Sequence, residues 1–264
     1  MNIINIFAYF VIYSFLGWVL ESVFKTCLEK KLVNSGFLHG PFCPIYGIGA
    51  IIMYIGLNGA KEYPFLVFIL GFIILSVWEY LVGWGLEKLF NTKYWDYSKN
   101  KFNIKGRVCL MNSIFWGILG IIFIYVINPF VESKIMYIPK SILLYILIIV
   151  YTYLLIDAII STVKVKNITI KFNKVKEIGK TIKEKLESLE DLKNNKEIEL
   201  KQYKIEALQK VIDDLKLKQN RLKIKLYRHT NRLKKAFPTM KSEVITEILN
   251  EKMKNLKRNK NSKE

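Results

Sequence analysis

The sequence predicts an all-α integral membrane protein with about five transmembrane helices and a long cytoplasmic tail that is helical or coiled-coil. Of the 264 residues, 52% are hydrophobic, yet the formal net charge is +19. These two properties belong to different parts of the chain. Residues 1–163 hold 12 basic and 8 acidic residues, whereas residues 164–264 hold 29 and 14. The first part also contains five apolar runs of about the length that crosses a bilayer.

The expected spans cover residues 3–24, 41–59, 64–90, 110–130 and 141–163. No basic region precedes the first run, which carries Glu21 rather than a small-residue cleavage site, so we expect a retained span. The second run opens with Gly40-Pro41-Phe42-Cys43-Pro44 and could instead be re-entrant or broken. Such backbone is tolerated at membrane depth only where protein or a water-filled cavity surrounds it.

Basic residues in the short loops predict the orientation, because an excess of Lys and Arg marks the cytoplasmic side. The loop after the first run has three lysines, and the loop after the third has four lysines and Arg107. Of basic residues, the loop after the second run holds only Lys61, and the loop after the fourth holds only Lys134 and Lys140. Together with the basic tail, this pattern predicts an N-terminus outside the cell and a cytoplasmic C-terminus.

Polar and small residues recur three or four positions apart in four of the runs, which places them on one helical face in each. Charges inside spans are costly and usually face the bundle interior. Small residues beside them allow neighbouring helices to approach closely. The four sets are Ser14, Gly17, Glu21 and Lys25; Ser76, Glu79, Gly83 and Glu87; Ser113, Gly117 and Gly120; and Tyr153, Asp157 and Ser161.

The unusual residues gather in the half of the membrane domain that the charge pattern places toward the cytoplasm. We therefore expect a polar site or packing centre built from Glu21, Glu79, Glu87, Asp96 and Arg107. Arg107 is the best counter-ion candidate for Glu79. Purely structural ion pairing is the alternative, since acids near span ends can reach the interface. The candidate loop residues are His39, Pro41, Cys43, Pro44, Tyr46, Trp95, Tyr97 and Ser98.

Four motifs occur in a particular order along the chain. They are residues 36–47 (GFLHGPFCPIYG), 78–88 (WEY followed by LEK), 94–98 (YWDYS) and 106–110 (GRVCL). Over residues 5–130 the chain thereby resembles a bacterial family of multi-pass membrane proteins described as ABC-transporter type IV permeases. The resemblance implies a multi-pass bacterial membrane protein and, less directly, a transporter subunit. It implies no particular substrate or catalytic residue.

Catalytic, nucleotide and metal motifs are not expected. Gly179-Lys180-Thr181 resembles the end of a phosphate-binding loop, but Lys174 stands where that loop needs glycine. Cys27, His39, Cys43 and Cys109 could in principle meet near one interface, yet their spacing fits no known zinc motif. We therefore predict no enzyme activity, no metal site and no cofactor. If ATP drives the protein, a separate ATPase subunit must supply it.

The tail, residues 164–264, is predicted as a second domain with a coiled coil over 174–235 and a terminal helix over 239–256. Its seam has apolar residues three and four apart, typical of a coiled coil within one chain or between chains. Alternatively, its basic residues could bind anionic lipid. Nucleic acid is not an expected partner. The seam residues are Ile205, Leu208, Ile212, Leu215, Gln219, Leu222 and Leu226, with Ile182, Leu186 and Leu189 forming a similar stripe upstream.

Two functions follow as hypotheses. The chain could be a permease-like transport component whose acids line a substrate or ion pathway. It could instead be a non-transporting membrane anchor or scaffold whose tail dimerises or recruits a partner. A cavity that reaches Glu79 from the cytoplasm would favour the first. A dry, fully packed bundle in which the tail makes the only large exposed surface would favour the second. The expected partners are the lipid bilayer, a second copy of the chain through the tail, and an ATPase subunit.

Overall fold

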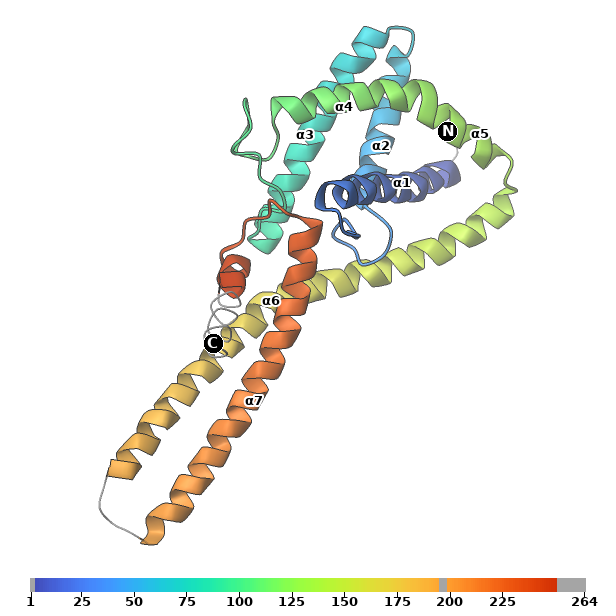
Figure 1. The fold of residues 1–264 in the computed structure, drawn as a ribbon. Coiled ribbons are helices and arrows are strands. Elements are labelled where there is room, and N and C mark those ends of the chain that lie inside the picture. The colour runs from blue at the N-terminus through green and yellow to red at the C-terminus, as the bar shows by residue number, and fades with distance from the viewer. Residues whose placement is uncertain (1–2, 195–198, 251–264) are drawn as a thin grey trace. The chain divides into compact units, whose positions relative to one another are not determined.

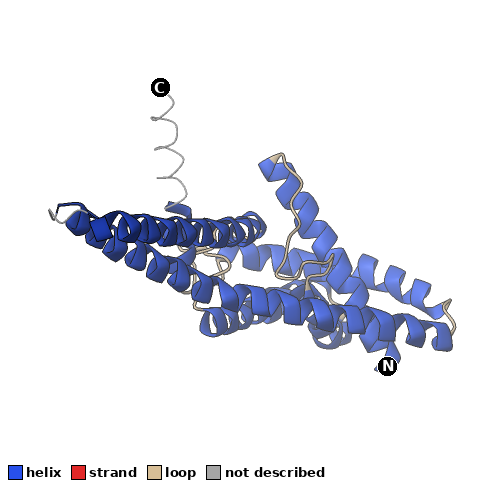
Figure 2. Ribbon diagram, turned by 90° about the horizontal axis from the view of Figure 1, so that it is seen from below, coloured by secondary structure: helices blue, strands red, loops and turns tan. Residues whose placement is uncertain are grey.

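The computed structural model describes residues 3–194 and 199–250, and the regular elements in these residues are helical (Figure 2). The chain forms two compact units. Unit 1 comprises residues 1–162 together with the segment 233–242, and unit 2 comprises residues 163–232 with the chain after residue 242. The short segment 233–242 therefore belongs to the apolar unit, although it lies in the charged part of the sequence.

The helices α1 to α7 follow one another along the described chain, and a further helical stretch, residues 243–250, comes after them (Figure 1). A 3₁₀ turn, Asn58–Ala60, extends α2, and a π-helical turn, Phe123–Ile127, joins α4 to α5. The helices are α1 Ile3–Glu29, α2 Pro44–Leu57, α3 Pro64–Phe90, α4 Leu110–Ile122, α5 Asn128–Met136, α6 Lys140–Asn194 and α7 Glu199–Ala236.

Four helical stretches in the described residues are long and apolar enough to cross a membrane, namely Ile3–Glu29, Pro64–Phe90, Leu110–Met136 and Lys140–Asp191. They agree with the first, third, fourth and fifth expected spans, and the all-α membrane class is confirmed. The second expected span is different, because α2 has 14 residues. At 1.5 Å per residue it covers about 21 Å, less than the roughly 30 Å of a bilayer core. The count of five spans and the sides of the termini stay predictions.

Prolines and residues with positive φ mark several helix ends of unit 1. Pro44 and Pro64 begin α2 and α3 at positions where the missing N–H costs nothing. Asn91 adopts the left-handed conformation just after α3, which is a common helix stop. The π-helical turn directly precedes Asn128-Pro129. A proline inside a helix removes one backbone hydrogen bond and clashes with the preceding turn, which accounts for the local widening.

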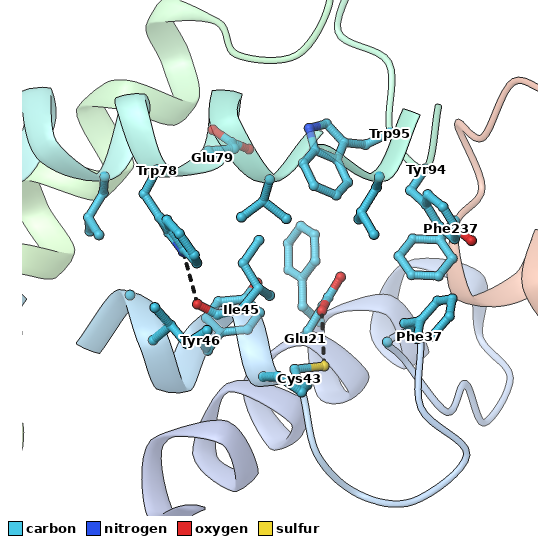
Figure 3. A pocket seen from close by; sticks show the side chains of 18 of the residues that line it. Glu21, Phe37, Cys43, Ile45, Tyr46, Trp78, Glu79, Tyr94, Trp95 and Phe237 are labelled. Atoms are coloured by element: carbon cyan, nitrogen blue, oxygen red, sulfur yellow. Dashed lines mark hydrogen bonds between the residues drawn. The ribbon is translucent and has the colours of Figure 1, made fainter. Parts of the chain in front are cut away.

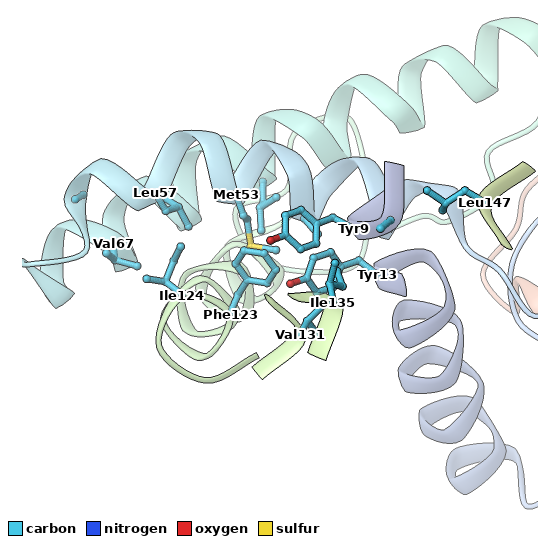
Figure 4. Close-up of a cluster of buried hydrophobic side chains, with 14 of the residues drawn as sticks. Tyr9, Tyr13, Met53, Leu57, Val67, Phe123, Ile124, Val131, Ile135 and Leu147 are labelled. Carbon is cyan, nitrogen blue, oxygen red and sulfur yellow. The ribbon is translucent and has the colours of Figure 1, made fainter. Parts of the chain in front are cut away.

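The core of unit 1 gathers side chains from α1, α2, α3, α5, the π-helical turn and the start of α6 (Figure 4). At its centre, Tyr13 packs edge-on against Phe123 with ring centroids 5.1 Å apart. The Tyr13 hydroxyl donates a 2.9 Å hydrogen bond to the Asn128 side chain, so neither buried polar group is left unsatisfied. This core leaves the opposite end of the unit, where the two long loops lie, free to form a cavity.

Small residues bring the helices of unit 1 into close contact, as the sequence pattern predicts. A Cβ placed on Gly71 of α3 would lie 3.2 Å from the Trp116 backbone oxygen of α4. One placed on Gly117 of α4 would lie 2.6 Å from the Phe68 ring of α3. Ser76 and Ser113 add a 2.7 Å hydrogen bond between the same helices. Close backbone packing of this kind is a main source of helix association in membranes.

Gly47 is the tightest contact between α1 and α2, and we expect Gly47→Ala to destabilise unit 1. The added Cβ would lie 2.2 Å from the Ser14 hydroxyl oxygen and 2.6 Å from the Phe10 carbonyl oxygen, and the backbone atom cannot move aside alone. Overpacking typically costs about 1–3 kcal/mol. Gly85→Ala is the matched control, because nothing lies within 4 Å of its Cβ position. The apparent melting temperature in detergent should fall for Gly47→Ala only; equal melting temperatures would contradict this packing.

Unit 2 is a helical hairpin of the second part of α6 and most of α7. Ile212 of α7, which is 2% exposed, packs in one cluster with Ile178, Ile182 and Leu189 of α6. The Gln219 side chain donates a 3.1 Å hydrogen bond to the Val175 carbonyl, again across the hairpin. The predicted apolar stripe of Ile182, Leu186 and Leu189 is wrong at Leu186, which is 38% exposed. Ile178 takes part in the buried cluster instead.

The terminal helix expected over 239–256 begins later than predicted. Residues 243–250 are helical, while residues 237–242 form a turn and an extended stretch after Pro238. Residues 251–256 of the expected helix lie outside the described residues. Lys176 of α6 forms an ion pair with Glu247 at 2.7 Å, so the described part of this helix contacts the hairpin within unit 2.

Candidate functional site

Unit 1 contains a cavity of about 620 Å³ at the end where the loops 30–43 and 91–109 lie (Figure 3). We call this end the loop end; the loops meet there, with Phe37 and Tyr94 5.9 Å apart between ring centroids. The charged residues in the cavity wall are Glu21, Lys25 and Glu79. Its aromatic residues are Phe24, Phe37, Tyr46, Trp78, Tyr94, Trp95, Tyr97, Trp116 and Phe237.

Glu79 is the most deeply buried charged residue of the wall, with 5% of its surface exposed. Three side chains donate hydrogen bonds to its carboxylate. The Trp116 indole lies 2.9 Å from one oxygen, and the Tyr97 hydroxyl and Asn112 amide lie 3.2 and 3.4 Å from the other. All three are donors, which suits the ionised carboxylate. Burial, together with the nearby Glu79 carboxylate, raises the pKa of Tyr97, so its hydroxyl keeps the proton that it donates.

Glu21 and Lys25 form the second charged group of the wall, one turn apart on α1. Their side chains make a 2.7 Å ion pair. Lys25 also donates to the Ala236 carbonyl and lies 5.1 Å from the centre of the Phe237 ring. The other Glu21 oxygen accepts a long 3.7 Å contact from the Cys43 thiol. The charge of Glu21 is therefore balanced within the wall.

The expected pair of Glu79 and Arg107 does not form. Arg107 instead binds Glu87, with its Nε and one terminal nitrogen 3.0 and 2.8 Å from the same carboxylate oxygen. A second terminal nitrogen donates to the Tyr80 hydroxyl at 3.1 Å. Glu87 lies two turns beyond Glu79 on α3, nearer to the loop that carries Arg107. This pair does not line the cavity.

The loop 91–109 is folded tightly around Asp96 and Arg107. Gly106 has a φ of +70°, and a Cβ there would lie 2.3 Å from an Asp96 carboxylate oxygen, so glycine is needed for both conformation and space. The Trp95 indole donates to the Arg107 carbonyl at 2.8 Å. Burial alone would raise the pKa of Asp96, but hydrogen bonds from Lys241 and Ser98 lower it overall. Asp96 is therefore ionised at neutral pH.

The loop 30–43 is held by α6. Asp157 of α6 accepts hydrogen bonds from the backbone N–H groups of His39 and Gly40, at 3.1 and 2.7 Å. The His39 ring lies 2.7 Å from the Ser161 hydroxyl. The face of the fifth span that carries Asp157 and Ser161 thus anchors the Gly40-Pro41 turn. These groups position the loop and do not line the cavity.

The segment 233–242 completes the cavity wall from the far end of the sequence. Phe237 packs edge-on against Tyr94, with ring centroids 4.9 Å apart, and both line the cavity with Pro238 and Thr239. The backbones of Lys93 and Lys241 exchange two 2.9 Å hydrogen bonds. The Lys241 side chain pairs with Asp96. These contacts fix the segment on the loop 91–109, and the contacts of Lys25 with Ala236 and Phe237 fix it on α1.

The expected polar centre is thus divided into several groups. Glu21 and Glu79 line the cavity, as do Cys43, Pro44, Tyr46, Trp95 and Tyr97, whereas Glu87 with Arg107, Asp96 with Ser98, and His39 with Pro41 lie outside its wall. Sequence reasoning missed Asn112 and Trp116 as partners of Glu79. Their spacing of four residues on α4 was a usable signal, because it puts both on one helical face.

A metal centre gains no support from the arrangement. Cys43 contacts Glu21, Cys109 accepts a 3.4 Å contact from Asn100, and Cys27 is exposed. Within residues 3–194 and 199–250, no three His, Cys, Asp or Glu side chains are grouped closely enough to hold a metal ion.

Fold and cavity together define a multi-pass helical membrane protein with a ligand-sized cavity at one end. The chain belongs to the family described as "Putative ABC-transporter type IV", whose family model matches residues 8–162. The match includes every cavity-lining residue except Phe237, Pro238 and Thr239. No curated protein and no solved structure is significantly similar to the chain.

Proposed function

We propose that the chain is the membrane component of an ABC-type transporter and that the cavity at its loop end holds the transported substrate. The observation that carries this proposal is the cavity itself, because a purely anchoring bundle needs none. Its volume of about 620 Å³ lies within the range typical of small-molecule sites, roughly 300–1,000 Å³. Such sites combine an apolar, aromatic lining with a few placed polar groups, and Glu21, Lys25 and Glu79 are those groups here.

In this proposal the loop end faces the cytoplasm, as the basic loops predict. The cavity is then loaded or emptied on the side where ATP is present. ATP must come from another subunit, because the one glycine-lysine-threonine sequence of the chain lies inside the helix α6 and lacks the phosphate-binding pattern. The four long apolar helices in the described part of the chain are few for a complete transport path, which also favours assembly with other subunits.

Purification from the membranes of the source organism tests this proposal. We expect an ATP-hydrolysing subunit to co-elute with the tagged chain in size-exclusion chromatography, giving vanadate-sensitive ATPase activity in the same peak. The same chain purified from an unrelated expression host should lack that activity and serves as the control. A stable homo-oligomer without an ATPase subunit, isolated repeatedly from native membranes, would contradict the proposal and favour a scaffold.

A further inference from the structure

We propose that the substrate of this cavity is an organic cation with an apolar, aromatic body. This inference rests on the proposed function, because it assigns a ligand class to the same site. It follows from two properties of the wall, namely one carboxylate without a counter-ion and an apolar lining that includes the rings of nine aromatic residues.

Of the two acidic residues in the wall, Glu21 has a basic partner and Glu79 does not. Glu21 is neutralised by Lys25 at 2.7 Å, and Arg107 is neutralised by Glu87 at 2.8 Å. In the described part of the chain, no Lys, Arg or His lies within 4.0 Å of the Glu79 carboxylate. Three neutral donors solvate that carboxylate instead. Coulomb attraction is strong in a poorly solvated site, so the carboxylate favours a positive ligand.

The aromatic residues of the lining also favour a positively charged ligand. Rings attract cations over their faces at distances up to about 6 Å, with Trp the most effective. Trp78, Trp95 and Trp116 all contribute to the wall. Figure 3 shows Trp78 and Trp95 facing Tyr46 and Cys43 across the cavity. The same rings bury the apolar body of a ligand, whereas a small hydrated cation would lose its water without enough oxygen ligands in return.

The wall offers little to an anion. Its one lysine, Lys25, already binds Glu21 and the Ala236 carbonyl and lies over the Phe237 ring. An anionic ligand would have to displace these contacts and would also meet the charge of Glu79. The cavity therefore discriminates by charge sign between ligands of equal size and shape.

Tetraphenylphosphonium and tetraphenylborate provide the test, because they have nearly the same size and shape but opposite charges. Equilibrium dialysis with the detergent-solubilised full chain should show the cation binding at least about tenfold more tightly than the anion, which corresponds to about 1.4 kcal/mol. Glu79→Gln should lower the affinity for the cation by a similar factor. The affinity for the anion should stay unchanged or rise slightly. Glu87→Gln is the matched control, because Glu87 is on the same helix but does not line the cavity.

The wild-type comparison of the two ions needs no variant, so it decides the inference even if Glu79→Gln fails to fold. A third variant, Val82→Trp, fills part of the cavity from α3. If both ions bind with equal affinity and Val82→Trp lowers both affinities, the cavity binds ligands without selecting by charge. That result would overturn this inference and leave the proposed function standing. If Val82→Trp changes neither affinity, the cavity is not the binding site and both proposals fail.

Discussion

Arg107→Ala is expected to lower the stability of unit 1 by about 2–4 kcal/mol. The substitution removes three hydrogen bonds, two to Glu87 and one to Tyr80, and the contact of the guanidinium with the Tyr80 ring at 5.2 Å. It also leaves the Glu87 carboxylate, whose side chain is 30% exposed, without its partner. Because the lost side-chain contacts join the loop 91–109 to Tyr80 and Glu87 of α3, the loop should loosen. A thermal-shift assay in detergent measures the loss.

A double-mutant cycle separates this interpretation from the one that the sequence first indicated. Arg107→Leu with Glu87→Leu should recover much of the stability, because replacing a paired charge by apolar side chains is often nearly neutral. Coupling between Arg107 and Glu87 should reach about 1 kcal/mol or more, whereas coupling between Arg107 and Glu79 should be within about 0.5 kcal/mol of zero. A larger coupling to Glu79 would mean that the ion pairs are assigned wrongly.

Ile212→Asp is expected to unfold the hairpin of unit 2. Ile212 is 2% exposed and joins both helices in one cluster, so an aspartate there buries an unpaired charge at the centre of the contact. Such a change costs about 4 kcal/mol or more. The hairpin has many lysines that become accessible once it opens. Limited trypsin digestion of the full-length protein should therefore cut α6 and α7 of the variant well before those of the wild type.

Val211→Asp is the matched control for this experiment. Val211 is the neighbouring residue of α7 and is 43% exposed, so the same new charge remains in water there. Both variants keep the same number of trypsin sites, and the control should be digested at the wild-type rate. Equal rates for Ile212→Asp and the wild type would show that the two helices do not depend on this cluster.

Much of the fold could be predicted because it follows from local patterns. Apolar runs of span length located the starts of α1, α3, the α4–α5 stretch and α6 to within one residue, whereas the ends of α1 and of the α4–α5 stretch lie five and six residues later than predicted. Small residues three and four apart correctly indicated the close faces of α3 and α4. The apolar seam of α7 could also be predicted from the sequence, since its residues Ile212 and Leu226 are both 2% exposed. Burial of one helical face leaves a periodic record in the sequence.

The pairing of charges could not be predicted in the same way. Glu79 and Glu87 lie on one face of α3, and the sequence does not say which of them is nearer to Arg107. That choice depends on how the loop 91–109 folds back, which is set by local features such as Gly106 at φ +70°. Asp157 was placed on its helical face, but its contact with the loop 30–43 joins residues 117 and 118 positions apart. Sequence periodicity carries no information on such contacts.

The contribution of the segment 233–242 was the largest omission. The predicted coiled coil ends at residue 235 and the terminal helix starts at 239, with Pro238 between them, but nothing in the charged pattern there indicates a return to the apolar unit. Phe237 is a large apolar residue at the start of this turn, and its packing against Tyr94 depends on tertiary structure alone. Part of the cavity wall therefore comes from outside the region that the family shares.

The most direct test of the account is whether water-soluble molecules reach the cavity from the cytoplasmic face. A cysteine at Val82, in a chain with Cys27, Cys43 and Cys109 replaced by alanine, would be exposed to a membrane-impermeant cationic thiosulfonate in vesicles of each orientation. Ile73→Cys is the control, because Ile73 is on the same helix, is 51% exposed and does not line the cavity. We predict labelling of Val82→Cys in inside-out vesicles only, slowed by tetraphenylphosphonium. No labelling from either side, or labelling only from the outside, would contradict the account.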